Sequence, residues 1–321
     1  MIVLGAGVWG MALSFVLAKK NKNVLVWDHD PALLTTLEKT RKHPRLPGSL
    51  TLPENIQVCK TLNEEVFAKH DVLVVVPSYA FEVLMQTLKP LLTKETSLIW
   101  ATKGLSKSGE FLYNVALDIL GENQGLAVLS GPSFALEVAQ DVPTAVMIAS
   151  PKREVAENFR RKFSTPHFQV FTTDDMVGVQ LGGVLKNVLA VMSGLSDGLK
   201  FGSNTRAALI TRGMNEMMAL GKVMNARPET LMGLAGLGDM ILTCTDDQSR
   251  NRRFGLALGQ GQSESEILDK IGESVEAVYN VDQVCKLGRS NHVPLPIAEQ
   301  VFRVIKQQVS PREAILTLFA S

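Results

Sequence analysis

Gly5-Ala6-Gly7-Val8-Trp9-Gly10 decides the fold that this sequence predicts, because it fits the pattern G-x-G-x-x-G between an apolar run and a helical stretch. In such a motif the first glycine allows a tight turn, the second lets the backbone approach a pyrophosphate, and the third lets helix and strand pack closely. The pyrophosphate would lie at the helix N-terminus, where N–H groups and the helix dipole favour an anion. The motif therefore predicts dinucleotide binding, and a glycine-rich turn without a ligand is the alternative.

Asp28 follows Gly10 at a spacing close to the ~20 residues expected of a ribose-binding acid. An acid at this position favours NAD, because it would repel the 2′-phosphate of NADP. The alternative is turn chemistry, since Asp is common where strands end. His29 and Asp30 beside it leave the choice between NAD and NADP open.

The first half of the chain alternates short β-rich runs with helical stretches. Several runs, such as residues 72–76, are apolar throughout, which is typical of a parallel sheet covered by helices on both faces. This predicts an α/β Rossmann-type doubly wound sheet over residues 1–175. The expected strands are Ile2–Leu4, Asn23–Trp27, Asp71–Val76, Ser97–Ala101, Leu126–Leu129, Thr144–Ile148 and Gln169–Phe171.

From Met176 onward the pattern is helical, which predicts an all-α second domain over residues 176–321. Ser203, Ser249 and Ser310 occupy expected N-cap positions, and Pro311 an expected first turn. The expected helices are Met176–Ser196, Asn204–Met224, Arg250–Leu258, Glu276–Leu287, Leu295–Gln307 and Pro311–Phe319.

Composition narrows the function classes. The 33 basic and 32 acidic residues give a formal charge of +1, which argues against a general nucleic-acid binder. Cys59, Cys244 and Cys285 show no CxxC pairing, so we expect neither a disulfide framework nor a bound metal. We also expect no signal peptide and no membrane span, since no run approaches ~20 uninterrupted apolar residues. A reducing compartment is the simplest interpretation of these cysteines.

Two loops follow expected strands, at the sheet edge where doubly wound folds bind ligands. Lys103 lies in Thr102-Lys103-Gly104, and Gly131 and Ser133 lie in Ser130-Gly131-Pro132-Ser133. A cation at the mouth of the cofactor crevice would bind a phosphate or orient a carbonyl. A solvated surface lysine is the alternative.

The second half contains a lysine inside an apolar helical pattern. Lys186 shares a helix face with Gly182 and Gly183, which suggests close approach by a bound ligand or by another helix. Partial desolvation would lower the pKa of Lys186 and suit it to proton transfer, whereas snorkelling to solvent is the alternative. Asp239 is expected in a glycine-containing loop, where it forms an Asx-turn, orients the Lys186 ammonium or hydrogen-bonds a substrate hydroxyl.

Three arginines follow Ser249 in the first turn of an expected helix, as Ser249-Arg250-Asn251-Arg252-Arg253. Cations at this end oppose the helix dipole, which indicates that an anion is bound there. A substrate phosphate held by Arg250 and backbone N–H groups would resolve the conflict, and neutralisation by Asp246 and Asp247 is the alternative. Arg252 and Arg253 are expected to be structural.

Across essentially the whole chain the sequence resembles bacterial NAD(P)-dependent glycerol-3-phosphate dehydrogenases. Six motifs carry this resemblance in the family's order. They are Gly5-Ala6-Gly7-Val8-Trp9-Gly10, Ala101-Thr102-Lys103-Gly104-Leu105, Ser130-Gly131-Pro132-Ser133-Phe134-Ala135, Leu185-Lys186-Asn187, Gly236-Leu237-Gly238-Asp239-Met240 with Thr243-Cys244, and Ser249-Arg250-Asn251-Arg252-Arg253-Phe254.

The resemblance implies hydride transfer between NAD(P)H and dihydroxyacetone phosphate, giving sn-glycerol 3-phosphate for glycerophospholipid synthesis, with Lys186 as general acid/base. It also implies a cytoplasmic homodimer. Val8, where many members have Ser, and Asp28, where many have a small residue, depart from the family pattern. The implied substrate contacts are Lys103, Gly131, Ser133, Lys186, Asp239, Ser249, Arg250 and Asn251. The implied cofactor contacts, together with the glycine motif and the Asp28-His29 pair, are Trp9, Lys103, Ala135, Arg250 and Glu276.

Two alternatives share this domain plan. One is a 3-hydroxyacid or phosphogluconate dehydrogenase, which also uses a lysine from a helical domain. The phosphate-suited cluster at Ser249 favours a small phosphorylated ketone instead. The other is a non-catalytic NAD(H)-binding sensor, against which the two lysines and Asp239 argue.

Overall fold

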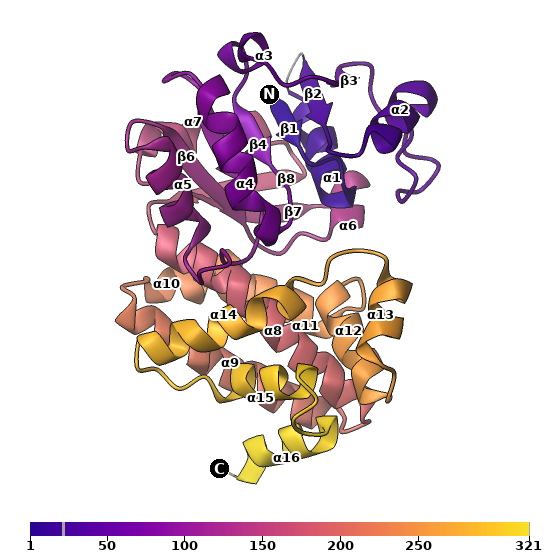
Figure 1. Cartoon of the computed structure of the whole chain (residues 1–321), viewed down its shortest axis with the longest axis vertical. Coiled ribbons are helices and arrows are strands. Elements are labelled where there is room, and N and C mark those ends of the chain that lie inside the picture. The colour runs from indigo at the N-terminus through magenta and orange to yellow at the C-terminus, as the bar shows by residue number, and fades with distance from the viewer. Residues whose placement is uncertain (21–22, 321) are drawn as a thin grey trace. The chain divides into compact units, whose positions relative to one another are not determined.

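The chain forms two compact units (Figure 1). The computed structural model describes residues 1–20 and 23–320. The first unit comprises Met1–Thr102 and Leu112–Met176, and the second comprises Lys103–Phe111 and the chain from Val177 onward. Sequence analysis placed one boundary, between residues 175 and 176, and did not anticipate that residues 103–111 belong to the helical unit.

The first unit is built on a sheet with the strand order β3-β2-β1-β4-β5-β6-β7-β8. Neighbouring strands are parallel except for β6 and β7, which are antiparallel. The predicted Rossmann-type doubly wound fold is therefore confirmed. The strands are β1 (Ile2–Leu4), β2 (Val24–Trp27), β3 (Ile56–Val58), β4 (Val72–Val74), β5 (Ser97–Trp100), β6 (Gly125–Ser130), β7 (Thr144–Ala149) and β8 (Phe168–Thr173).

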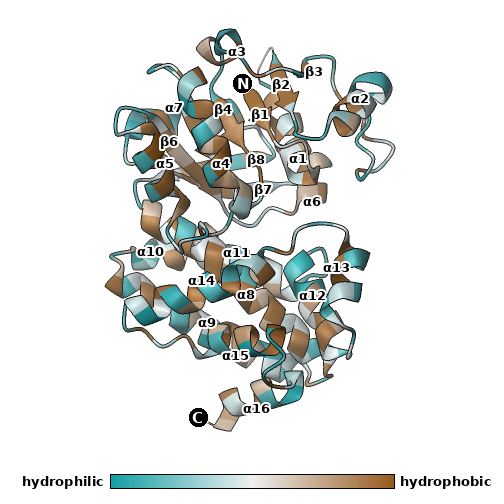
Figure 2. Cartoon of the chain, in the orientation of Figure 1, coloured by the Kyte–Doolittle hydropathy of each residue, from teal (hydrophilic) through white to brown (hydrophobic). Residues whose placement is uncertain are grey.

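Sequence analysis missed β3, because this edge strand has three residues and only Ile56 among them is buried. The strands are largely hydrophobic (Figure 2) and pack against helices that bury Leu13 and Phe159, among others. The helices of this unit are α1 (Val8–Ala18), α2 (Pro31–Thr40), α3 (Glu64–Ala68), α4 (Ser78–Leu88), the 3-10 turn η1 (Lys89–Leu91), α5 (Leu112–Leu120), α6 (Ala135–Ala139) and α7 (Arg153–Phe163).

From Met176 onward the regular elements of the described chain are all helical, as predicted, whereas residues 103–111 of the second unit form no helix. Short elements between the longer helices had no sequence signal strong enough to be identified. The elements are α8 (Met176–Gly198), α9 (Ser203–Val223), α10 (Pro228–Leu231), the π-helical turn η2 (Leu234–Gly238), α11 (Asp239–Thr245), α12 (Arg250–Gly259), α13 (Glu264–Ile271), α14 (Glu276–Ser290), α15 (Pro296–Ile305) and α16 (Pro311–Ala320).

Two of the three predicted N-caps are present. The Ser249 hydroxyl accepts the Arg252 N–H at 3.2 Å, and the Ser310 hydroxyl accepts the Glu313 N–H at 3.1 Å. The prediction for Ser203 is wrong, because Ser203 is already the first helical residue and Gly202, at a φ of 85°, precedes the helix as its N-cap. A positive φ suits glycine, which has no Cβ to clash.

Helix α8 runs through the core of the helical unit. Glycines let it touch α12 backbone to backbone: a Cβ on Gly194 would lie 2.1 Å from the Arg252 carbonyl oxygen, and one on Gly255 would lie 2.0 Å from that of Val191. In the part of the chain that the structure describes, α8 is also the one helix long and apolar enough to cross a membrane, but 94% of its apolar window is buried within the protein, as in a core helix.

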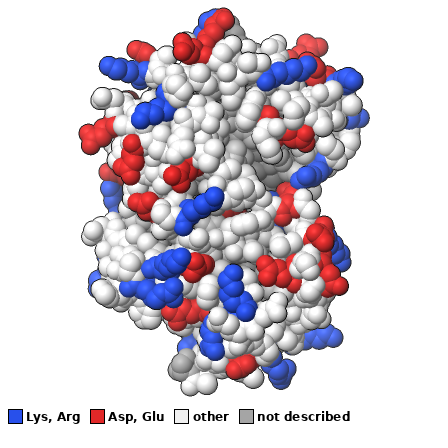
Figure 3. All heavy atoms as spheres, viewed as in Figure 1, with Lys and Arg blue, Asp and Glu red and all other residues white. Residues whose placement is uncertain are grey.

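Acidic and basic side chains are interspersed on the face shown in Figure 3. Other acidic side chains are withdrawn from solvent, and one that is partly buried lies on α9. Glu216 of α9 accepts the backbone N–H of Ile297, in the first turn of α15, at 2.8 Å. Burial raises the pKa of this carboxyl to about 7, with a smaller contribution from Glu299.

We predict that Glu216 makes the stability of the protein depend on pH. The folded state holds the Glu216 proton more tightly than the unfolded chain, so stability is lost as the pH rises from 4.5 through about 7. Glu216→Gln keeps the carbonyl oxygen that accepts the Ile297 N–H but does not titrate. Its stability relative to wild type should therefore increase by ~2 kcal/mol between pH 5 and pH 8. Urea unfolding at both pH values measures this, with exposed Glu229→Gln as control, and an equal difference at both values would contradict it.

Candidate functional site

The glycine turn of the first unit has the geometry that a pyrophosphate-binding turn requires. Gly5 has a φ of 107°, and a Cβ there would lie 2.4 Å from the Val75 carbonyl oxygen. A Cβ on Gly10 would lie 1.9 Å from the Gly5 carbonyl oxygen, whereas one on Gly7 would meet no atom within 4 Å. Steric contacts therefore require glycine at positions 5 and 10, because a Cβ there would clash. The space beside Gly7 is open to a ligand.

Helix α1 begins directly after Gly7, and its N-cap makes no side-chain hydrogen bond among the described residues. The N–H groups of its first turn, which includes the half-buried Trp9, are therefore suited to an anion. The residues present fit a dinucleotide pyrophosphate.

Asp28, at the end of β2, connects this strand to the glycine turn. Its Oδ2 accepts the N–H of Ala6 at 2.7 Å, and its Oδ1 accepts the N–H of Asp30 at 3.0 Å. The Nδ1 atom of the largely exposed His29 lies 2.9 Å from the same Oδ1. Asp28 therefore has the turn-forming role considered as the alternative, whether or not a ribose also contacts it.

The loop after β6 lies in the same unit. Gly131 has a φ of 143°, and a Cβ there would lie 3.0 Å from the Val146 Cα atom. The Ser133 hydroxyl donates to the Gly131 carbonyl oxygen at 2.9 Å. Ala135 is the first residue of α6, which packs against α1. The fold thus brings this predicted segment to the helix that follows the glycine turn.

The centre of the candidate site is a buried carboxylate between two ammonium groups of the helical unit. The Lys186 Nζ lies 2.7 Å from Asp239 Oδ1, and the Lys103 Nζ lies 2.6 Å from Asp239 Oδ2. Lys186 also donates to the Thr243 hydroxyl at 3.0 Å, and that hydroxyl donates to the Asp239 backbone carbonyl at 2.6 Å. The Asp239 side chain is 1% exposed, so water does not screen these charges.

The backbone around Gly182 explains this proximity. A Cβ on Gly182 would lie 2.2 Å from the Ala235 carbonyl oxygen, so this glycine lets η2 lie directly on α8. Close packing of another helical element is therefore the reason for Gly182. The expected loop around Asp239 is a misassignment: residues 234–238 form the π-helical turn, and Asp239 begins α11. Glycines weaken the helical signal of this segment, and tertiary packing overrides that weakness.

Burial and the neighbouring charges set the proton affinity of the network. The pKa of Lys186 is lowered to about 8, chiefly because burial disfavours the ammonium; the Asp239 carboxylate offsets part of this effect, and the Lys103 cation adds to it. Burial opposes ionisation of Asp239, but the two ammonium groups outweigh it and hold the pKa of this carboxyl below its ordinary value. Burial raises the pKa of nearby Cys244 to about 12, so it remains a thiol and is unsuited to act as a nucleophile.

Asparagine side chains connect this network to neighbouring helices. Asn251 Nδ2 donates to Asn187 Oδ1 at 2.9 Å, and Asn251 Oδ1 accepts the N–H of Ala277 at 3.0 Å. Asn187 Nδ2 makes a longer contact, 3.4 Å, with the Lys103 carbonyl oxygen. Asn251 thus satisfies a buried N–H in the first turn of α14 while it orients Asn187.

The arginines after Ser249 differ in their partners. Arg250 Nη1 lies 2.9 Å from Glu273 Oε2, and the Arg250 side chain is 38% exposed. Arg252 is buried, with its Nη1 atom 2.6 Å from Asp197 Oδ2 and its Nε atom 2.9 Å from Asp247 Oδ1. Arg252 therefore has a structural role. Of the two aspartates just upstream, Asp247 pairs with it, as the neutralisation alternative predicts for that arginine.

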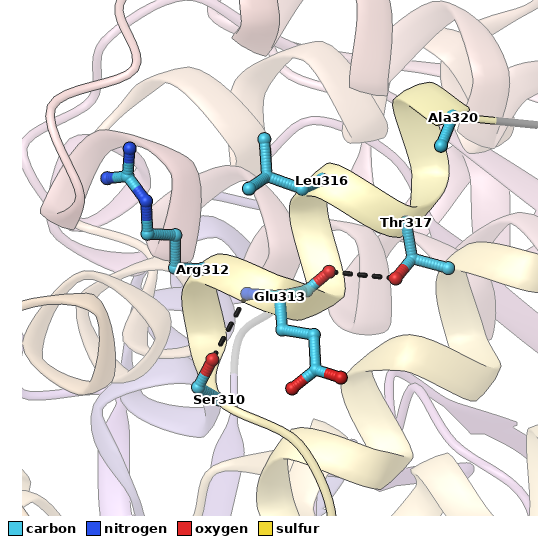
Figure 4. A pocket seen from close by; sticks show the side chains of 6 residues that line it. All are labelled: Ser310, Arg312, Glu313, Leu316, Thr317 and Ala320. Atoms are coloured by element: carbon cyan, nitrogen blue, oxygen red, sulfur yellow. Dashed lines mark hydrogen bonds between the residues drawn. The ribbon is translucent and has the colours of Figure 1, made fainter.

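Sequence reasoning missed one polar residue of the site. Asn280 of α14 donates its Nδ2 to Glu276 Oε2 at 2.8 Å and accepts the N–H of Leu105 at 2.7 Å on its Oδ1. A single asparagine inside a helical pattern has no motif signal, and its partner Leu105 lies far away in the sequence. The hollow on α16 in Figure 4 contains none of the predicted site residues; it is lined by Ser310, Arg312, Glu313, Leu316, Thr317 and Ala320.

We predict opposite effects of two substitutions on the pKa of Lys186. Lys103→Met removes a repelling cation and should raise this pKa, whereas Asp239→Asn removes the stabilising carboxylate and should lower it. ¹³C NMR titration of lysine ε-carbons, with the Lys186 resonance assigned from Lys186→Arg, measures both shifts. Exposed Lys222→Met is the control, and shifts of the same sign in the two variants would refute the arrangement of charges.

Family models, curated relatives and solved structures all point to one protein family. The family model described as the NAD-dependent glycerol-3-phosphate dehydrogenase N-terminus matches residues 1–156, and that of the C-terminus matches residues 175–316. A Vibrio parahaemolyticus protein named glycerol-3-phosphate dehydrogenase [NAD(P)+] is 46% identical over 100% of this chain and 93% of its own. A Xanthomonas campestris protein of the same name is 44% identical over 99% and 94%. The crystal structure of glycerol-3-phosphate dehydrogenase from Coxiella burnetii is 42% identical, with a TM-score of 0.96 over 100% of this chain and 98% of that one.

Proposed function

The chain belongs to the NAD-dependent glycerol-3-phosphate dehydrogenase family, and we propose that Lys186, Asp239 and Lys103 form the catalytic centre of this activity. The enzyme is an oxidoreductase that interconverts dihydroxyacetone phosphate and sn-glycerol 3-phosphate with NAD or NADP. When bound, the nicotinamide supplies or accepts the hydride at the substrate's second carbon. The product is a precursor of glycerophospholipids.

The observation that carries the proposal is the buried Lys186–Asp239–Lys103 network. In the reduction, Lys186 donates a proton from Nζ to the carbonyl oxygen of dihydroxyacetone phosphate, and in the oxidation it removes that proton. A pKa near 8 makes both protonation states accessible near neutral pH. Asp239 and Thr243 both hydrogen-bond to Nζ. These two contacts restrict the positions that Nζ can adopt, which favours the position that faces the substrate.

The phosphate of the substrate is proposed to bind at the N-terminus of α12. Arg250 supplies a guanidinium that forms a bidentate contact, and the helix supplies backbone N–H groups and the positive end of its dipole. Ser249 shapes this turn through its cap, and Asn251 acts through Asn187. Gly131 and Ser133 are proposed to complete the substrate contacts, as family resemblance implies.

The cofactor is proposed to lie on the glycine turn. Gly5, Gly7 and Gly10 shape the backbone for the pyrophosphate, and Trp9, Ala135, Lys103, Arg250 and Glu276 contribute contacts that family resemblance implies. Asp28 and His29 face the adenosine ribose in this proposal, and the Asp28 carboxylate favours NAD over NADP. A cytoplasmic homodimer also remains a proposal from family resemblance.

Loss of Lys186 should abolish turnover and leave cofactor binding intact. Lys186→Ala is expected to lower kcat for dihydroxyacetone phosphate reduction by ~10²–10⁴-fold, because it removes the proton donor. Spectrophotometric oxidation of NADH and of NADPH measures this and establishes the preferred cofactor. Exposed Lys222→Ala is the matched control. Wild-type protein that binds cofactor but turns over neither substrate nor product would contradict the catalytic assignment and support a sensor.

At saturating cofactor, loss of Arg250 should weaken recognition of the substrate phosphate. Arg250→Ala is expected to raise KM for dihydroxyacetone phosphate by ~10–100-fold, because a charge-assisted contact to the dianion is lost. Turnover of unphosphorylated dihydroxyacetone, measured at the same saturating cofactor concentration, should change little. Arg253→Ala, at an exposed position in the same turn, is the matched control. Equal losses with both substrates would show that Arg250 does not bind the phosphate.

A further inference from the structure

We propose that Asn280 is a positioning residue that fixes the segment carrying Lys103 to the helical unit and joins it to Glu276. The inference rests on the proposed function, from which it takes the roles of Lys103 and Glu276. It concerns a residue outside every motif that the sequence analysis identified.

Residues 103–111 lie in the chain between β5 and α5, yet they are part of the helical unit. Leu105 and Phe111 are buried in the core of that unit, at 2% and 6% exposure, and pair with each other in a short antiparallel bridge. The chain therefore leaves the first unit after β5 and returns to it at α5. Between these elements, Leu105 and Phe111 anchor the segment in the core of the helical unit. Apolar contacts alone are non-directional and do not set the rotation of the backbone at Lys103.

Asn280 supplies a directional contact. Its side chain is 3% exposed, and its Oδ1 accepts the N–H of Leu105 at 2.7 Å. Leu105 lies two residues after Lys103, so this hydrogen bond sets the backbone from which the Lys103 side chain reaches Asp239. Asn187 also contacts the Lys103 carbonyl oxygen, but at 3.4 Å that hydrogen bond is weaker.

The same amide holds Glu276 with its other end. Asn280 Nδ2 donates to the Glu276 backbone carbonyl at 2.9 Å and to Glu276 Oε2 at 2.8 Å. A short side chain that both donates and accepts is required here, and the asparagine amide provides both. Aspartate would keep the acceptor for Leu105 but place a second carboxylate against Glu276, and alanine would remove both contacts. The two functions of Asn280 are thus separable by substitution.

The experiment compares Asn280→Ala and Asn280→Asp with Lys103→Ala and with Cys285→Ala, a matched control at a buried position on the same helix. Asn280→Ala should lower kcat for dihydroxyacetone phosphate reduction by ~10-fold, because small displacements of a positioned group are costly. The midpoint of its pH–rate profile should move upward, as in Lys103→Ala, since the Lys103 cation leaves the vicinity of Lys186. Asn280→Asp should keep the wild-type kcat and pH midpoint, and should raise KM for the nicotinamide cofactor several-fold. Cys285→Ala should change thermal stability alone.

The outcomes separate this inference from the proposed function. Asn280→Ala with wild-type kcat and pH midpoint, in the presence of an impaired Lys103→Ala, overturns the inference. An unimpaired Lys103→Ala instead refutes the proposed role of Lys103. If Asn280→Ala does not fold, Asn280→Asp decides alone, and an unchanged cofactor KM in that variant overturns the link to Glu276.

Discussion

The Asp239 carboxylate, buried between the ammonium groups of Lys103 and Lys186, is the interaction on which the candidate site depends. An isolated buried charge is strongly unfavourable, and the two neighbouring ammonium groups are what keep the Asp239 carboxylate ionised at this depth. Two cations and one anion leave an excess positive charge. Burial, with a smaller effect of the Lys103 cation, lowers the pKa of Lys186, and the excess positive charge is suited to an anionic ligand. In the proposed function, this one arrangement would serve both proton transfer and substrate attraction.

Backbone packing makes this arrangement possible. Gly182 lets the turn before Asp239 lie on α8, and Gly194 and Gly255 let α12 lie on the same helix farther along. Each of these glycines lowers intrinsic helix propensity. The close packing places Lys186 of α8 beside Asp239 and Thr243 in α11. Substitution of any of these glycines by a larger residue would separate backbones that are in contact, so the constraint is steric and local.

Buried asparagines of the helical unit orient neighbouring helices and segments through hydrogen bonds. Asn251 connects α12 to α8 and to the start of α14, and Asn280 connects α14 to the segment that carries Lys103. Buried amides of this kind are stable only when their donors and acceptors are paired, which restricts the helices to one register. In the first unit, Asp28 plays a comparable part, because its carboxylate fastens the glycine turn to β2.

The sequence by itself determined the two fold classes, nearly all strands and long helices, and the residues of the glycine turn. Hydrophobic periodicity and glycine sterics are local properties, and local properties are readable from one chain. Family motifs also identified Lys186, Asp239 and Arg250 as candidates. Tertiary structure alone decided which partner each of them has. It placed residues 103–111 in the helical unit, turned the expected loop at Asp239 into a helical turn, and paired Asn280 with Leu105. These contacts join residues far apart in the sequence, and their geometry depends on how close two backbones come, which no local pattern encodes.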